Sequence, residues 1–164
     1  MPRTPITNAM LEKIPSDVLL QLDNQLCFAL HSASRRVVKA YRAELEPLDL
    51  TFPQYLVLLV LWEWEHNREP HPTVTALGER LDLDSGTLTP LLKRLEQKEL
   101  ITRERGKTDE REVLIYVTRE GSAMKSRARE VPLKLLRRST LSLGQIGKLR
   151  EQLKELRSDL AAAS

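Results

Sequence analysis

Cys27 is the only cysteine of the chain and the residue whose chemistry would be most distinctive. A thiolate attacks peroxides and disulfides, provided that nearby donors or positive charges stabilise it and that it can be reached. His31 and Arg35 follow one and two turns later in a helix that we expect to include Cys27 near its middle. A lone helical cysteine is, however, more often a small buried apolar residue. The sequence leaves both interpretations open.

A second group of residues has the chemistry of DNA recognition. One expected helix carries short hydroxyl side chains near its start and basic side chains one turn later, namely Ser85, Thr87, Thr89, Lys93 and Arg94. A basic hairpin follows, with candidate phosphate or minor-groove contacts at Arg103, Arg105, Lys107 and Arg111. Asp109 lies two residues before Arg111, and we expect its carboxylate to hold that arginine in one orientation by a charge-assisted pair. An ordinary charged hairpin is the alternative.

The elements around these residues predict a winged helix-turn-helix at 50–118. Thr51, Pro53 and Gln54 have the pattern of a capped helix start, and Thr73 can cap a second helix. Asp84 or Ser85 caps the recognition helix, in which we expect Pro90 to distort the first turn or cause a bend. Strands at 100–104 and 113–118, joined by a polar loop, complete the wing. This layout places a helix in the major groove and a hairpin in the neighbouring minor groove.

The flanking segments predict a fold that is mainly α, with only this small β-wing. We expect a flexible arm at 1–16, one long helix at 17–48 and basic helices from 119 that Pro132 bends. The last helix begins near Leu143 and repeats apolar residues at steps of three and four, namely Ile146, Leu149, Leu153, Leu156 and Leu160. Helices of this length exceed what a small DNA-binding domain can cover. The segments 17–48 and 119–164 are therefore predicted to dimerise the protein.

Composition and charge are consistent with a DNA-binding protein. The chain has 164 residues, of which 41% are apolar and 30% charged. Residues 119–138 hold seven basic and two acidic side chains, a local excess near the expected wing, although a solvated helix face would look the same. The start has no signal-peptide pattern, and the longest apolar run, 55–62, is too short for a bilayer, so we expect a cytoplasmic protein without membrane contact.

No cofactor or metal is expected. Two histidines and two glutamates cluster before the second helix, at Glu65, His66, Glu69 and His71. The two histidines do not have the spacing of four that places two histidine ligands on one side of a helix, and there is no cysteine partner. A polar surface turn is the preferred interpretation.

The wing sequence DER at 109–111, placed after a helix-turn-helix, resembles the MarR family of dimeric bacterial regulators. Four further motifs, in order, are similar to the organic hydroperoxide resistance regulators of that family: LDNQLCF from Leu22, TFPQYL from Thr51, LWE from Leu61 and LDSGTLTPLLKR from Leu83. The resemblance covers about 22–132. It implies a homodimer on a pseudo-palindromic operator, with terminal helices that interlock between subunits.

The resemblance also assigns a role to the cysteine. Cys27 stands at the peroxide-sensing position of that group, and Tyr41 matches a tyrosine that reaches the sensing thiol across the dimer interface. Two other tyrosines of the group are Phe52 and His31 here; Tyr55 or His31 is the expected substitute for the missing hydroxyl. Because there is no second cysteine, reversible oxidation requires a sulfenamide or a low-molecular-weight thiol.

The resulting hypothesis is a homodimeric repressor that releases its operator when an organic hydroperoxide oxidises Cys27. The nearest alternative is a MarR-type repressor that a small aromatic or phenolic ligand releases, with Cys27 merely structural. An enzyme is not expected: a thiol peroxidase would leave the wing unexplained, and no arginine or threonine constellation surrounds the cysteine. A protein-binding adaptor that uses the leucine repeat would show no salt-dependent DNA binding.

Overall fold

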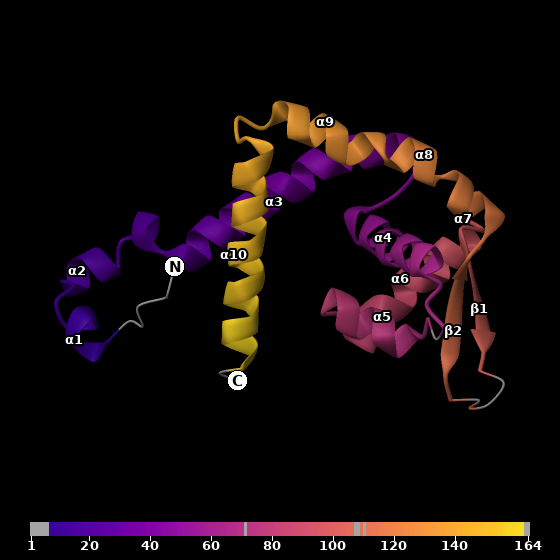
Figure 1. Cartoon of the computed structure of the whole chain (residues 1–164), viewed down its shortest axis with the longest axis horizontal. Coiled ribbons are helices and arrows are strands. Elements are labelled where there is room, and N and C mark those ends of the chain that lie inside the picture. Colours follow the sequence, from indigo (N-terminus) through magenta and orange to yellow (C-terminus); the bar gives the residue numbers. More distant parts are fainter. Residues whose placement is uncertain (1–6, 71, 107–108, 110, 163–164) are drawn as a thin grey trace. The chain divides into compact units, whose positions relative to one another are not determined.

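The computed structural model of the chain describes residues 7–70, 72–106, 109 and 111–162 (Figure 1). It divides into two compact units, Met1–Ala43 and Glu44–Ser164, each of which is described by itself. The elements are mostly helices, with one two-stranded antiparallel sheet. The predicted fold class, mainly α with a small wing, is confirmed.

The single long helix predicted at 17–48 is wrong. The structure has α1 (Asn8–Leu11), α2 (Ser16–Leu19), a 3-10 turn (Leu22–Asn24) and then α3 (Leu26–Leu45). Polar side chains explain the break. Asn24 Nδ2 donates to the carbonyl of Val18 at 2.9 Å, and Gln25 Nε2 donates to that of Leu19. These bonds satisfy the last carbonyls of α2 and compete with continuation of the helix. A helical turn at α1 also lies within the segment expected to be a flexible arm.

Helix α4 (Phe52–Asn67) is the centre of the second unit. It follows a 3-10 turn (Glu46–Leu48) and starts with the predicted capping box: Thr51 N–H donates to Gln54 Oε1 at 3.0 Å, and Thr51 Oγ1 accepts from Gln54 N–H at 3.5 Å. Its apolar residues are spread around the axis, so the helix is covered on several sides. Seven of its residues are buried, namely Gln54, Tyr55, Val57, Leu58, Val60, Leu61 and Trp62.

Helices α5 (Val74–Leu81) and α6 (Ser85–Gln97) form the predicted helix-turn-helix. Thr73 caps α5 and Asp84 caps α6. At Gly78, an added Cβ would lie 2.9 Å from the carbonyl oxygen of Leu83, so the turn can approach α5 closely only at a glycine. Helix α6 runs through Pro90 as one helix, and the Thr89 hydroxyl donates to the carbonyl of Ser85 at 2.7 Å.

Strands β1 (Ile101–Arg105) and β2 (Val113–Val117) form the wing, in a register that pairs Ile101 with Val117. The sequence did not indicate a third contribution: Thr73 forms an isolated bridge with Leu114, and Ile115 N–H donates to the carbonyl of Pro72 at 2.8 Å. This bridge joins the start of the helix-turn-helix to the wing.

Three helical segments follow the wing: α7 (Arg119–Ala123), α8 (Lys125–Ala128) and α9 (Glu130–Arg138). The interruption at Arg129 lies where Pro132, inside α9, removes a bond to Ala128 and crowds its carbonyl. Gly121 of α7 is required, because an added Cβ would lie 2.1 Å from the carbonyl oxygen of Leu100. The Gly121 carbonyl accepts from the buried Trp62 indole N–H at 3.0 Å, which ties α7 to α4.

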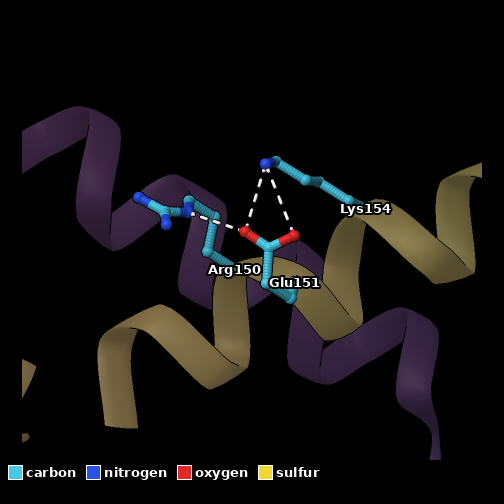
Figure 2. Close-up of polar contacts among 3 residues, drawn as sticks. All are labelled: Arg150, Glu151 and Lys154. Atoms are coloured by element: carbon cyan, nitrogen blue, oxygen red, sulfur yellow. Dashed lines mark hydrogen bonds and ion pairs between the residues drawn. The ribbon is translucent and has the colours of Figure 1, made fainter. Parts of the chain in front are cut away.

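The last helix, α10 (Leu143–Ala162), begins where the sequence predicts. It has no buried residue within the chain as described. Figure 2 shows polar contacts along it: Glu151 accepts from Arg150 Nε at 3.3 Å and from Lys154 Nζ at 3.1 Å. Within the described residues, no helix of the chain is long and apolar enough to cross a membrane.

Candidate nucleic-acid interface and thiol site

The start of α6 carries an ordered group of polar side chains. The Asp84 carboxylate accepts from the Thr87 N–H through Oδ1 and from the Thr87 hydroxyl through Oδ2, both at 2.8 Å. The hydrogen bond from the Thr87 hydroxyl lowers the pKa of Asp84, and the backbone N–H bond adds to the effect. The helix therefore begins at a carboxylate that its first turn holds in one orientation.

The exposed side of α6 holds all five residues predicted to recognise DNA in this helix. Ser85, Thr87, Thr89, Lys93 and Arg94 are exposed, while Leu88, Leu92 and Leu95 are buried on the opposite side. Thr87 and Arg94 are seven residues apart and share one flank of the helix. Thr89 and Lys93 are four apart and share the other flank. Each flank thus offers a threonine first and a cation further along.

Arg103 differs from the expectation. It was expected to contact DNA, but its guanidinium binds Glu96 Oε2 of α6, with Nε at 3.0 Å and Nη2 at 2.5 Å. The same hydrogen bonds lower the pKa of Glu96. Since Arg103 lies on β1, this ion pair joins the recognition helix to the wing. Glu96 was not predicted as part of the site, and its only signal in the sequence is an acidic residue seven positions before an arginine.

The part of the wing beyond the ion pair of Arg103 with Glu96 has exposed basic side chains. Arg105 and Arg111 are exposed, whereas Lys107 lies outside the described residues. Asp109 Oδ1 accepts from the backbone N–H of Arg111 at 2.9 Å. The expected pair between this carboxylate and the Arg111 guanidinium is not among the ion pairs of the described residues. Asp109 thus orders the backbone of the turn and leaves the arginine side chain to other contacts.

Most basic residues of 119–138 are engaged within the chain. Lys125 Nζ pairs with Glu65 at 2.5 Å, and Ser122 donates to the same carboxylate at 2.7 Å. Arg127 donates to the carbonyl of Pro47 at 2.8 Å. These contacts tie α7 and α8 to elements that precede the helix-turn-helix, and they show that a local charge excess does not by itself mark a DNA-binding face.

Glu44 extends this network to α9. Lys134 and Arg138 both pair with its carboxylate, at 2.9 Å and 2.7 Å. The hydrogen bond from Lys134 is the largest cause that lowers the pKa of Glu44, as the bond from Lys125 is for the pKa of Glu65. Both carboxylates are therefore held in the charged form by cations of the helices that follow the wing.

Cys27 is the second residue of α3, not a mid-helix residue as expected, and it is exposed. The break after α2 places it at a helix start, where backbone N–H groups have no intrahelical acceptor and a negative charge is favoured. His31 follows one turn later on the same face and is also exposed. The cysteine is therefore accessible within the chain.

Tyr41 shares α3 with Cys27, but the two are 14 residues apart. At 1.5 Å per residue, a helix separates them by about 21 Å along its axis, so they cannot meet within one chain. Burial raises the pKa of the half-buried Tyr41 hydroxyl, which therefore remains a proton donor at neutral pH. Phe52 is half-buried at the start of α4, and Tyr55 lies in the core of the second unit, with 2% of its surface exposed.

The cluster of histidines and glutamates offers little for a metal. His71 lies outside the described residues, and the Glu65 carboxylate already binds Ser122 and Lys125. Among the residues that the structure does describe, no group of three metal-ligating side chains occurs.

The chain is similar to known transcriptional regulators. The family model of transcriptional regulator SarA/Rot matches residues 39–128. A Bacillus subtilis (strain 168) protein named organic hydroperoxide resistance transcriptional regulator is 48% identical over 86% of this chain and 88% of its own length.

Solved structures of AbfR have a fold similar to that of this chain. The reduced, DNA-bound form is 34% identical, with a TM-score of 0.72 over 90% of this chain and 99% of that chain. A disulfide-formed structure is 35% identical, with a TM-score of 0.61 over 86% and 96%. With a relative at 48% identity over most of both chains and DNA-bound structural neighbours, this chain belongs to the MarR family of winged-helix transcriptional regulators, in the group of the organic hydroperoxide resistance regulators.

Proposed function

We propose that the protein is a homodimeric repressor that senses organic hydroperoxides through Cys27 and releases a pseudo-palindromic operator when this residue is oxidised. The carrying observation is the exposed position of the only cysteine, at the start of α3, in a chain 48% identical to an organic hydroperoxide resistance regulator. The similar protein AbfR has been solved both in a reduced form bound to DNA and in a disulfide form, which supports a redox role for the cysteine here.

The homodimer is supported by what a single chain leaves uncovered. Helix α10 buries none of its residues, and α3 buries only Leu45. Large apolar side chains are exposed in both, including Leu26, Phe28, Leu149 and Leu153. Exposed apolar surface of this extent marks an interaction site. A second copy would also resolve the separation of Cys27 from Tyr41, since antiparallel α3 helices bring the start of one beside the end of the other.

The chemistry requires one peroxide and one thiol. The Cys27 thiolate attacks the terminal oxygen of the hydroperoxide, the O–O bond breaks, and the departing alkoxide takes a proton to become the alcohol. Cys27 becomes a sulfenic acid, oxidised by two electrons. A low-molecular-weight thiol then attacks the sulfenic sulfur, which gives a mixed disulfide and water. Added bulk at the base of α3 changes the packing of the dimer, and a small rotation moves both recognition helices away from a spacing of one DNA turn.

The test compares the binding of native protein and of Cys27→Ser to a promoter fragment of the gene that encodes the protein, at fixed salt. Cumene hydroperoxide with a low-molecular-weight thiol is expected to release the native protein and to leave the serine variant bound. Mass spectrometry of the released protein should find the added thiol on Cys27. If neither protein is released while both bind DNA tightly, the redox proposal is wrong.

The alternative, release by a small phenolic ligand, has its own outcome in the same assay. Salicylate added under reducing conditions would release native protein and Cys27→Ser equally. Within one chain Cys27 is exposed, so no packing inside the chain accounts for a cysteine at this position, which favours the redox proposal.

A further inference from the structure

The two threonines of the recognition helix have their hydroxyl protons directed inward. An ionised carboxylate and a backbone carbonyl can only accept hydrogen bonds. Asp84 Oδ2 must therefore take its proton from the Thr87 hydroxyl, and the Ser85 carbonyl must take its proton from the Thr89 hydroxyl. What each threonine presents to solvent is its methyl group and the lone pairs of its oxygen.

Asp84 is held in its ionised form, which can only accept the proton of the Thr87 hydroxyl. The hydrogen bonds from Thr87 lower its pKa, so the carboxylate remains ionised at neutral pH. Gly86 contributes by lacking a side chain, since an added Cβ would lie 3.0 Å from Asp84 Oδ1. The carboxylate therefore lies against the first turn and accepts from the Thr87 N–H.

We propose that Thr87 and Thr89 contact base edges with their methyl groups and with their hydroxyl oxygens, which accept hydrogen bonds. Asp84 is the positioning residue that sets the direction of the Thr87 hydroxyl. This inference rests on the proposed function and specifies its DNA chemistry. In the major groove, the complements of a methyl and an acceptor are the thymine C5-methyl and the amino groups of adenine and cytosine. The O6 and N7 of guanine, both acceptors, are left to Lys93 and Arg94 further along each flank.

The first experiment selects duplexes from a library with randomised positions, using reduced full-length protein at fixed salt. In the best selected site, thymine is then replaced by uracil, which removes only the C5-methyl group. Loss of one buried methyl contact should weaken binding by about fourfold in each half-site. Thr87→Val keeps the methyl group, replaces the hydroxyl by a second methyl and should retain this sensitivity, whereas Thr87→Ser should lose it at the position that Thr87 contacts.

The second experiment reverses the direction of one hydroxyl. In Asp84→Asn the amide oxygen can still accept from the Thr87 N–H, and asparagine caps helices as well as aspartate does. Its NH₂ group would donate to the Thr87 oxygen and turn the Thr87 proton outward. Asp84→Asn should then gain guanine at the Thr87 position, by roughly fivefold or more in selection.

One further variant and one unaffected position control this result. Asp84→Asn combined with Thr87→Val has no hydroxyl to turn, so it should not gain guanine. The preference at the Thr89 position should not change, because the proton acceptor of Thr89 is the backbone carbonyl of Ser85. Circular dichroism checks that the helix content of each variant is unchanged.

The outcomes separate the inference from the function on which it rests. If native protein selects no duplex in a salt-dependent manner, the proposed function fails and the inference fails with it. If native protein selects a site, the inference is overturned by indifference to uracil, or by a guanine preference at the Thr87 position that Thr87→Val abolishes.

Discussion

Helices α4 and α10 are of similar length, 16 and 20 residues, but α4 buries seven residues and α10 buries none. Both are rich in leucine. The difference lies in their surroundings: α4 packs against α5, α6 and β2 within its own chain, while α10 carries a leucine repeat with little to cover it. A long helix of this kind is stabilised in water mainly by packing of its apolar side. The comparison indicates that the DNA-binding unit, from α4 to β2, is stabilised by contacts within itself, whereas the terminal helices need a second surface to cover their apolar side chains.

Helix α3 contains the same contrast along a single element. Its last turn holds Leu45, which is fully buried, and Glu44, which pairs with Lys134 and Arg138 of α9. Its first turn exposes Leu26, Cys27 and Phe28. If the partner is a second copy of the chain, the proposed sensor Cys27 lies in the region whose packing depends on assembly, and the proposed oxidation would act where few contacts within the chain hold the helix.

The largest expected effect contrasts two neighbours on α4. Leu58 is fully buried, and Leu59 is 40% exposed. Leu58→Ala should lower the free energy of unfolding by about 2–5 kcal/mol, because the deleted atoms leave a cavity in the core. Leu59→Ala should cost much less at the same protein concentration. Urea unfolding measures both, and an equal loss would contradict the different burial of Leu58 and Leu59 as the cause.

The second prediction concerns assembly through α10. Leu149 and Leu153 are 47% and 40% exposed in the single chain. If a second copy covers them, replacing both by alanine removes about 1 kcal/mol of association free energy for each leucine. A dimer holds four such leucines, so its Kd should rise by roughly 10²–10³-fold. Sedimentation equilibrium measures this change.

Glu151→Gln is the matched control on the same helix. The Glu151 contacts shown in Figure 2 lie within α10 and are exposed to solvent. Exposed ion pairs contribute little, so no shift of the monomer–dimer equilibrium is expected. A native protein that is monomeric at micromolar concentration would contradict the homodimer.

The contrast between the two regions also explains what could be predicted from the sequence. In the DNA-binding unit, Thr51, Thr73 and Asp84 act through the adjacent turn, so the helix starts follow from local spacing. The break before α3 depends on side chains of Asn24 and Gln25 that reach back six residues to carbonyls, which an apolar period does not reveal. The pair of Glu96 and Arg103 could not be predicted either, because it depends on how α6 packs on β1.

A third prediction separates bracing from DNA contact within the wing. Arg105 is exposed, while Arg103 is held by Glu96. If Arg105 neutralises one phosphate, Arg105→Ala should reduce the slope of log K against log salt concentration by about 1. Arg103→Ala should weaken binding by misplacing the wing and leave that slope unchanged. Fluorescence anisotropy over a salt series distinguishes the two, and a reduced slope for Arg103→Ala would show that its pair with Glu96 opens on DNA.

The smallest expected effect is the pH dependence of the stability that the contacts of Glu65 with α7 and α8 contribute. Bonds from Lys125 and Ser122 lower the pKa of Glu65 from its ordinary value of 4.5. A carboxylate with a lowered pKa in the folded state contributes stability that is fully present above about 4.5 and is lost as the pH falls towards the folded value. Glu65→Gln should therefore destabilise the protein at pH 7 and narrow the difference in Tm between pH 7 and pH 4. Glu151→Gln should narrow that difference less, although the pKa of Glu151 is also lowered, because its pairs with Arg150 and Lys154 are more exposed to solvent and more strongly screened. Equal changes in the two variants would mean that the tie from α4 to α7 and α8 adds no stability of its own.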